Sequence, residues 1–195
     1  MKTIPLYENY PELNPIKDQI ELAVQLIVDC HKNNGLVLLC GNGGSAADCS
    51  HIVGELMKEF RENRQGYNEF DSNLVDGVAA IDLTANKSLI TAMANDVDPD
   101  KVFSQQVYVY SKHNPFNLLI GLSTSGKSEN VVQAFEIANK MGLQTIALTG
   151  ENDSRLSELG YCVIQAPAHE TYRVQEYHLA IYHYICSEVE RELFD

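Results

Sequence analysis

The stretch "NLLIGLSTSGKS", Asn117 to Ser128, joins an apolar run to a polar loop that leads into a helix. "NLLIGL" is short and continuously apolar, which is typical of a strand buried on both faces. After the loop "STSGKS" we expect a helix from about Ser128 to Lys140, ended by Gly142. A strand, a loop and a helix in this order form the repeating unit of a parallel sheet.

The same alternation extends in both directions along the chain. Near the N-terminus, Asn14 and Pro15 are expected to open a helix that Asn34-Gly35 closes. Its apolar residues recur at helical spacing: Ile16, Ile20, Val24 and Ile27. Further strands are expected at "LVLLC" (Leu36 to Cys40), "GVAAIDL", "QTIAL" and "YCVIQA". Further helices are expected after "GNGGSAAD", in "SLITAMAN" and "DKVFSQQVYVYS", near Ser154 to Leu159, and from about Tyr172. The sequence therefore predicts an α/β fold with a parallel sheet covered on both faces, and a polar surface excursion from Arg61 to Gly77.

Size and charge limit the possible functions. A chain of 195 residues with 45% hydrophobic residues fits one domain with a substantial core. A net charge of −13 disfavours a nucleic-acid surface, which needs clustered Lys and Arg. No apolar run is long enough to span a bilayer, and the N-terminus has no apolar signal core. The five cysteines form no C-x-x-C pair, so we expect buried thiols in a cytoplasmic protein without a membrane partner.

The loop from Gly121 to Ser128 also matches the phosphate-loop pattern of nucleotide triphosphatases. Such enzymes need a downstream strand that ends in a metal-binding aspartate. Neither "QTIAL" nor "YCVIQA" ends in Asp, and Asp82 of "VAAID" lies upstream. The four hydroxyl side chains of the loop could bind a phosphate without a cation, as could the backbone N–H groups of "CGNGGS" and "LSTSGKS" at the helix starts. The sequence therefore favours a phosphorylated ligand other than a nucleotide.

Four segments together resemble the sugar isomerase (SIS) domain family, and most closely its phosphoheptose isomerases. They are "GNGGSAADCSHIVGEL" from Gly41, "AMANDVDPDKVFSQQV" from Ala92, "GLSTSGKSENVVQAFEIANKMGLQTIALTG" from Gly121, and "TYRVQEYHLAIYH" from Thr171. The resemblance implies a single SIS domain over residues 1–195, with an N-terminal helical segment (1–35) and an α/β core (36–195). It implies a three-layer α/β/α sandwich with a flavodoxin-like sheet. It also implies a homotetramer, with an N-terminal helix that joins an intersubunit bundle and with sites built between subunits.

The implied reaction is the interconversion of sedoheptulose 7-phosphate and D-glycero-D-manno-heptose 7-phosphate through an enediol. Glu55 and His183 match the acid/base pair of the family. The matching substrate-binding positions are Asn42, Ser45, Asp96, Ser123, Thr124, Ser125, Ser128 and Gln175, of which the Ser and Thr residues from 123 to 128 would hold the phosphate. The positions that hold zinc in some relatives are His51, Glu55, Gln175 and His183.

The residue types suit this chemistry. Moving a carbonyl between two carbons requires a base, a group that shuttles a hydroxyl proton, and stabilisation of the enediol. His51 and Glu55 are four residues apart, so they project from one helical face and can meet one ion or one sugar, although such a pair is also common on a solvated helix. Gln175 and His183 span about 12 Å along a regular helix, so they reach one ion only with extended side chains or a distorted helix.

Two positions depart from the family pattern. Lys58 and Glu59 replace the usual Gly-Arg after the first motif, which leaves Lys58 or Arg61 to compensate for an arginine. The segment "NDVDPDKVF" lacks the Gly-Tyr that normally follows Asn-Asp. The substrate is therefore open within the phosphosugars, and another phosphosugar reaction such as that of a lyase is a further alternative. A different class of function also remains: a non-catalytic SIS tetramer that binds a replication-initiator protein or senses a sugar phosphate.

Overall fold

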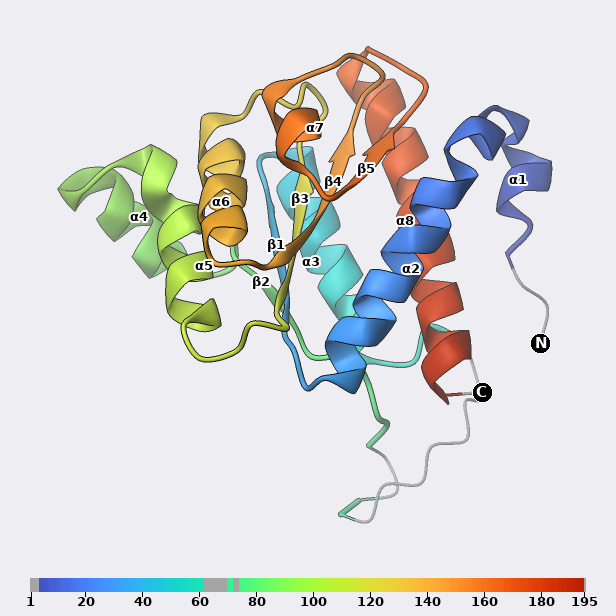
Figure 1. The fold of residues 1–195 in the computed structure, drawn as a ribbon, viewed down its shortest axis with the longest axis horizontal. Coiled ribbons are helices and arrows are strands. Elements are labelled where there is room, and N and C mark those ends of the chain that lie inside the picture. The colour runs from blue at the N-terminus through green and yellow to red at the C-terminus, as the bar shows by residue number, and fades with distance from the viewer. Residues whose placement is uncertain (1–3, 62–69, 72–73, 195) are drawn as a thin grey trace.

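The computed structural model describes residues 4–61, 70–71 and 74–194. Within these ranges, five parallel strands form one sheet in the order β2-β1-β3-β4-β5 (Figure 1). The strands are β1 (Val37–Gly41), β2 (Ala80–Asp82), β3 (Leu118–Leu122), β4 (Gln144–Thr149) and β5 (Cys162–Gln165). This strand order is that of the flavodoxin-like doubly wound folds. The predicted fold class is therefore confirmed.

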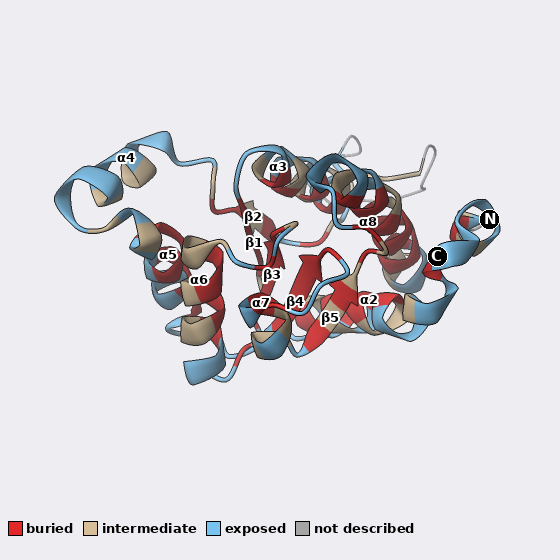
Figure 2. Ribbon diagram, turned by 90° about the horizontal axis from the view of Figure 1, so that it is seen from above, coloured by how far each residue is buried: buried red, intermediate tan, exposed pale blue. Residues whose placement is uncertain are grey.

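Helices cover both faces of the sheet (Figure 2). One face is covered by α2 (Lys17–Lys32), α3 (Gly44–Met57) and α8 (Thr171–Phe194), and the other by α5 (Val102–Ser111) and α6 (Glu129–Lys140). The shorter helices are α1 (Leu6–Asn9), α4 (Lys87–Asp96) and α7 (Arg155–Leu159), together with 3₁₀ turns at Pro11–Ile16 and Pro99–Lys101. α4 projects from one end of the molecule and has no fully buried residue.

Successive side chains of the central strands point to opposite faces of the sheet. Val37 and Leu39 of β1 point into the core shared with α2 and α8, whereas Leu38 and Cys40 point into the core shared with α5 and α6. This period of two is the normal consequence of strand geometry. Because both faces are covered, both sets of residues are apolar, which explains why these strands could be predicted from continuous apolar runs.

The N-terminal helix begins later than its sequence suggests. Asn14 and Pro15 lie inside the 3₁₀ helix, and the α-helix starts at Lys17. Proline has no N–H group to donate within an α-helix, which favours a start of regular pairing after it. The predicted end is confirmed, because Asn34 adopts a φ of 55° and the Gly35 N–H donates to the Cys30 carbonyl at 2.8 Å.

The apolar stripe of α2 is used within the chain. Ile20, Val24 and Ile27 are at most 2% exposed and pack in the core between the sheet and α8, while Ile16 packs at its margin. These side chains cannot also form an intersubunit bundle. The stripe therefore gives no argument for oligomerisation, and the N-terminal segment belongs to the same core as the strands. The tetramer stays a prediction from the family resemblance.

The predicted polar excursion from Arg61 to Gly77 falls partly outside the described residues, which exclude 62–69 and 72–73. Its beginning is held against α8. The backbone N–H groups of Phe60 and Arg61 donate to the Glu190 carboxylate at 2.7 and 3.1 Å. The Arg61 guanidinium contacts the same carboxylate and donates to the Ser187 carbonyl at 2.9 Å. The Arg61 side chain is therefore engaged with α8.

Two expectations about the whole chain can be compared with the fold. All five cysteines are buried free thiols, as predicted. None of the helices in the described ranges combines the length and apolar character that a bilayer crossing requires.

His178 is a fully buried histidine of α8. Its Nε2 lies 3.2 Å from the Thr149 carbonyl oxygen, to which it donates as the protonated nitrogen. Its Nδ1 is buried without a hydrogen-bond partner among the described residues. Burial lowers the pKa of His178 to about 4, although the bond to Thr149 acts in the opposite direction.

This pKa makes the stability of the protein depend on pH. The unfolded chain binds a proton at position 178 below about pH 6.5, whereas the folded chain resists protonation until about pH 4. Acid therefore favours unfolding. His178 should lower the free energy of unfolding by an amount on the order of 3 kcal/mol between pH 7 and pH 4. We expect His178→Gln to flatten the fall of the unfolding free energy with pH. Urea unfolding at pH 7 and pH 4.5 checks this, and equal slopes for wild type and variant would contradict it.

Candidate active site

A pocket of about 290 Å³ lies where the chain leaves β1 and β3. Neighbouring strands β1 and β3 end together, with Gly41 paired to Leu122, and the chain then turns to opposite sides of the sheet. Such a switch point at the carboxyl edge is the usual ligand site of open α/β sheets. The pocket is lined by Asn42, Gly43, Gly44, Ser45, Leu122, Ser123, Thr124, Ser128, Thr171 and Gln175.

Three helices begin at this pocket. α3 starts at Gly44, α6 follows Ser128, and α8 starts at Thr171. Helix starts carry unpaired N–H groups and partial positive charge, which together attract anions. None of the described lining residues is a lysine or an arginine. An anion in this pocket would therefore be held by backbone N–H groups and hydroxyls.

The loop after β3 places its hydroxyls unequally. Ser123, which is 3% exposed, donates to the Ser128 hydroxyl at 3.0 Å, and both line the pocket with Thr124. Ser125 instead is exposed, lies outside the lining, and accepts a hydrogen bond from the Lys127 backbone N–H at 3.2 Å. The structure thus brings three of the four predicted phosphate-binding hydroxyls together and leaves Ser125 at the rim.

The same loop is not arranged as a nucleotide-hydrolysing site. Lys127 is exposed at the turn and is not among the lining residues. Asp82, which ends β2, is buried and accepts hydrogen bonds from the Ser50 hydroxyl and the Thr84 N–H. Neither residue is placed to serve a nucleotide phosphate and its magnesium ion.

Asn42 and Asn130 close the rim of the pocket through a reciprocal amide pair. Each side chain donates to the other, at 2.9 and 3.0 Å. Of these residues, the sequence predicted Asn42 but neither Asn130 nor Thr171, which also lines the pocket. A usable signal existed, because the helices of a doubly wound fold all begin at the carboxyl edge of the sheet. The first residues of α6 and α8 could therefore have been included.

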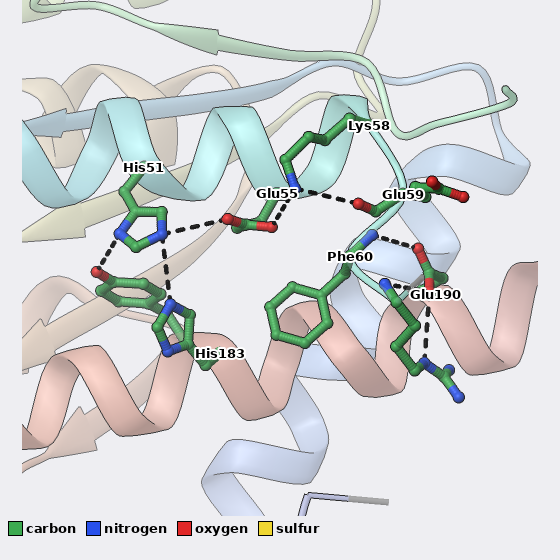
Figure 3. Close-up of polar contacts among 9 residues, drawn as sticks. His51, Glu55, Lys58, Glu59, Phe60, His183 and Glu190 are labelled. Carbon is green, nitrogen blue, oxygen red and sulfur yellow. Dashed lines mark hydrogen bonds and ion pairs between the residues drawn. The ribbon is translucent and has the colours of Figure 1, made fainter. Parts of the chain in front are cut away.

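A second cluster lies farther along α3 and α8, where Glu55 and His183 both approach His51 (Figure 3). His51 Nε2 lies 3.2 Å from Glu55 Oε1 and 3.4 Å from His183 Nε2. The rings of His51 and His183 pack edge to face with centroids 4.9 Å apart. The structure therefore brings together the predicted acid/base pair and the histidine predicted to project beside it.

Burial and neighbouring charges act on Glu55 and His183 in this cluster. The Glu55 side chain is 15% exposed, and its second oxygen accepts a hydrogen bond from the Lys58 ammonium at 2.9 Å. Burial lowers the pKa of His183, and His51 lowers it further, whereas the carboxylate of Glu55 opposes both effects. A lowered pKa keeps His183 neutral near pH 7, when an imidazole can both accept and donate a proton. Lys58, which departs from the family pattern, thus pairs with the candidate base.

The spacing of the cluster can be compared with that of a zinc site. Two ligands of a tetrahedral zinc ion, each about 2.0–2.1 Å from the metal, lie about 3.3–3.4 Å apart. The two contacts of His51 Nε2 come close to this value. However, no three His, Cys, Asp or Glu side chains of the described chain are arranged to hold one metal ion. The described side chains therefore do not form a ready zinc site.

Two predicted residues lie apart from the cluster. Gln175 lines the pocket, and its carboxamide packs so closely on Gly44 that a Cβ there would lie 2.4 Å from its Nε2. Gln175 therefore lies at the pocket, together with the predicted substrate-binding residues Asn42 and Ser45. Asp96 is exposed at the end of α4, where it accepts a hydrogen bond from Asn95 at 2.7 Å, and it is not among the lining residues.

Residues 13–150 match the model of the SIS domain family. Named relatives cover nearly the whole chain. A phosphoheptose isomerase from Akkermansia muciniphila is 37% identical over 96% of this chain and 92% of its own length. A phosphoheptose isomerase from Citrifermentans bemidjiense is 39% identical over 94% of this chain and 87% of its own.

Solved structures of phosphoheptose isomerases are also similar to this chain. A phosphoheptose isomerase from Neisseria gonorrhoeae superimposes with a TM-score of 0.78 at 30% identity, covering 94% of this chain and 91% of that one. One from Francisella tularensis superimposes with a TM-score of 0.80 at 29% identity, covering 91% and 88%.

Proposed function

This chain belongs to the SIS domain family, and we propose that it is a phosphoheptose isomerase. It interconverts sedoheptulose 7-phosphate and D-glycero-D-manno-heptose 7-phosphate, an aldose–ketose isomerisation. The names of its relatives support this assignment. Because both sugars are phosphorylated, we place the reaction in the cytoplasm.

One observation carries the proposal: the anion pocket and the acid/base cluster lie along the same two helices. Gly44 at the start of α3 borders the pocket, and Glu55 follows eleven residues later, about 16 Å farther along the helix axis. The Glu55 side chain leans back towards the helix start, which shortens this span. An elongated sugar with a terminal phosphate suits such a site, because its reacting carbons lie several bonds from the phosphate.

Each group of residues has a separate role in the proposed reaction. The hydroxyls of Ser123, Thr124 and Ser128 hold the phosphate with the N–H groups of the helix starts. Glu55 removes a proton from C1 of the ketose, and the electrons of that bond form the enediol while the C2 carbonyl oxygen gains a proton. His183 moves protons between the two oxygens, and Glu55 returns a proton to C2. No atoms are gained or lost overall.

Zinc binding by His51, Glu55, Gln175 and His183 stays a prediction of the family resemblance. In relatives with zinc, the metal would act as a Lewis acid on the substrate oxygens. Here the cluster is described without it, and no step above depends on it.

The alternative is a protein that binds an initiator protein or senses a sugar phosphate without turning it over. A binding site alone has no need for a carboxylate placed beside two imidazoles, so the cluster favours catalysis. The test is to incubate the purified protein with ketose phosphates of five, six and seven carbons and to follow products by NMR. We expect the heptulose 7-phosphate to give the aldose fastest. Binding of the sugar without any product would favour the alternative.

We also propose that the protein works as a homotetramer, on the basis of the family resemblance. Light scattering at micromolar concentration should give a mass close to that of four chains. A monomer would contradict the proposal and would require every residue of the site to come from one chain.

A further inference from the structure

Tyr182 lies directly behind the acid/base cluster. It is 2% exposed, although it carries a phenol group that needs a partner when buried. Its hydroxyl lies 3.0 Å from His51 Nδ1 and 3.2 Å from Asp48 Oδ1. Asp48 and His51 are both on α3, whereas Tyr182 comes from α8, immediately before His183. One hydroxyl therefore connects the two helices that carry the cluster.

The two nitrogens of His51 have separate tasks in this arrangement. If the Tyr182 hydroxyl donates to Asp48, its oxygen can accept a hydrogen bond from His51 Nδ1–H. The opposite nitrogen, Nε2, then carries the lone pair and can accept a hydrogen bond from His183 Nε2–H, while Glu55 Oε1 lies 3.2 Å from it. A ring turned by 180° would present carbon atoms to these partners, and both sets of contacts would be lost.

Ring packing acts in the same direction. The Tyr182 ring meets the His51 ring edge to face at 5.4 Å between centroids, and it meets the His183 ring in the same way at 4.9 Å. Since the tyrosine is buried and fixed by the core, it provides a rigid support for both imidazoles. A core aromatic would supply the packing alone, so the hydroxyl is the feature that requires explanation.

We infer that Tyr182 and Asp48 are positioning residues: Asp48 orients the Tyr182 hydroxyl, and this hydroxyl fixes the ring orientation and tautomer of His51 so that Nε2 faces Glu55 and His183. The consequence for turnover rests on the proposed function, whereas the consequence for the His51 ring does not. A carboxylate or hydroxyl that holds the far nitrogen of a functional histidine commonly has this role.

The test compares Tyr182→Phe with Tyr184→Phe. Tyr184 lies two residues later on α8 and donates to Glu21 at 2.7 Å, on the side facing α2, so its variant removes an equivalent hydroxyl from outside the site. We expect Tyr182→Phe to lower kcat roughly tenfold with KM changed less than about twofold. Tyr184→Phe should keep kcat near the wild-type value, and thermal melts should confirm that both variants fold.

A second readout is independent of catalysis. ¹⁵N NMR of the imidazoles, with His51 assigned by substitution, should show one dominant His51 tautomer in the wild type and in Tyr184→Phe. Tyr182→Phe should give a mixture. Asp48→Ala should act in the same direction, and Asp48→Asn should recover part of the effect because its amide oxygen can still accept from the hydroxyl.

The outcomes separate the two proposals. Unchanged His51 signals in Tyr182→Phe would overturn the inference, as would a kcat equal to that of Tyr184→Phe in an active enzyme. If the wild type turned over no sugar phosphate, the proposed function would fail, and the NMR comparison would still decide the role of Tyr182.

Discussion

Replacing Glu55 with glutamine should lower turnover of the heptulose phosphate by about a hundredfold or more, with little change in folding or in phosphosugar binding. A positioned general base typically contributes about 10²–10⁴-fold, and an amide cannot take up the proton. Glutamine keeps the shape of the side chain and can still contact His51 and Lys58. The pocket at the ends of β1 and β3 begins about three helical turns away at Gly44, so binding of the substrate phosphate should persist.

Steady-state kinetics together with calorimetric binding of the sugar phosphate measure this prediction. Glu59→Gln is the matched control, since it removes a carboxylate four residues later, and Lys58 contacts only the backbone carbonyl of Glu59. The control should stay within about threefold of wild type, as expected for a surface charge. Near-normal turnover by Glu55→Gln would show that another group is the base, whereas equal losses in both variants would point to a general effect of charge.

Much of the fold could be predicted because its strands are buried on both faces. "LVLLC" and "NLLIGL" allowed no competing interpretation as half-exposed strands, and both are central strands of the sheet. An amphipathic helix pattern, by contrast, does not show which surface its apolar side chains contact. The stripe of α2 is apolar because it packs on the sheet of its own chain, and a stripe for a partner subunit would look the same in sequence.

The site could be predicted only in part, for physical reasons. His51 and Glu55 lie on one helical turn, so their spacing shows that they can meet. That His183 joins them depends on how α8 crosses α3, which no local pattern encodes. Tyr182 is harder still, because an aromatic residue at a buried helix position usually serves packing, and its hydroxyl contacts emerge only in three dimensions.

The second large effect is expected on binding of the sugar phosphate, from a substitution in the loop of residues 123–128. Ser128→Ala should weaken binding of the sugar phosphate by about 1.5–3 kcal/mol, because it removes a hydroxyl placed to donate to a charged oxygen. Ser128 is the N-cap of α6, yet its side chain makes no capping hydrogen bond, so the helix itself should lose little stability. Lys127→Ala should cost about 1 kcal/mol or less, since its exposed charge is screened by solvent and salt.

Ser125 separates two explanations of this loop. Because it is exposed, outside the pocket lining and already bonded to the Lys127 N–H, Ser125→Ala should affect binding less than Ser128→Ala does. A loop that simply needed all its hydroxyls would respond equally to both changes. Calorimetric titration with sedoheptulose 7-phosphate, performed on the Glu55→Gln background to prevent turnover, gives the three affinities, and ATP with magnesium is titrated in parallel. If Lys127→Ala proved the most damaging change, or if ATP bound more tightly than the sugar phosphate, the loop would be a nucleotide site, and the pocket at the ends of β1 and β3 would need another explanation.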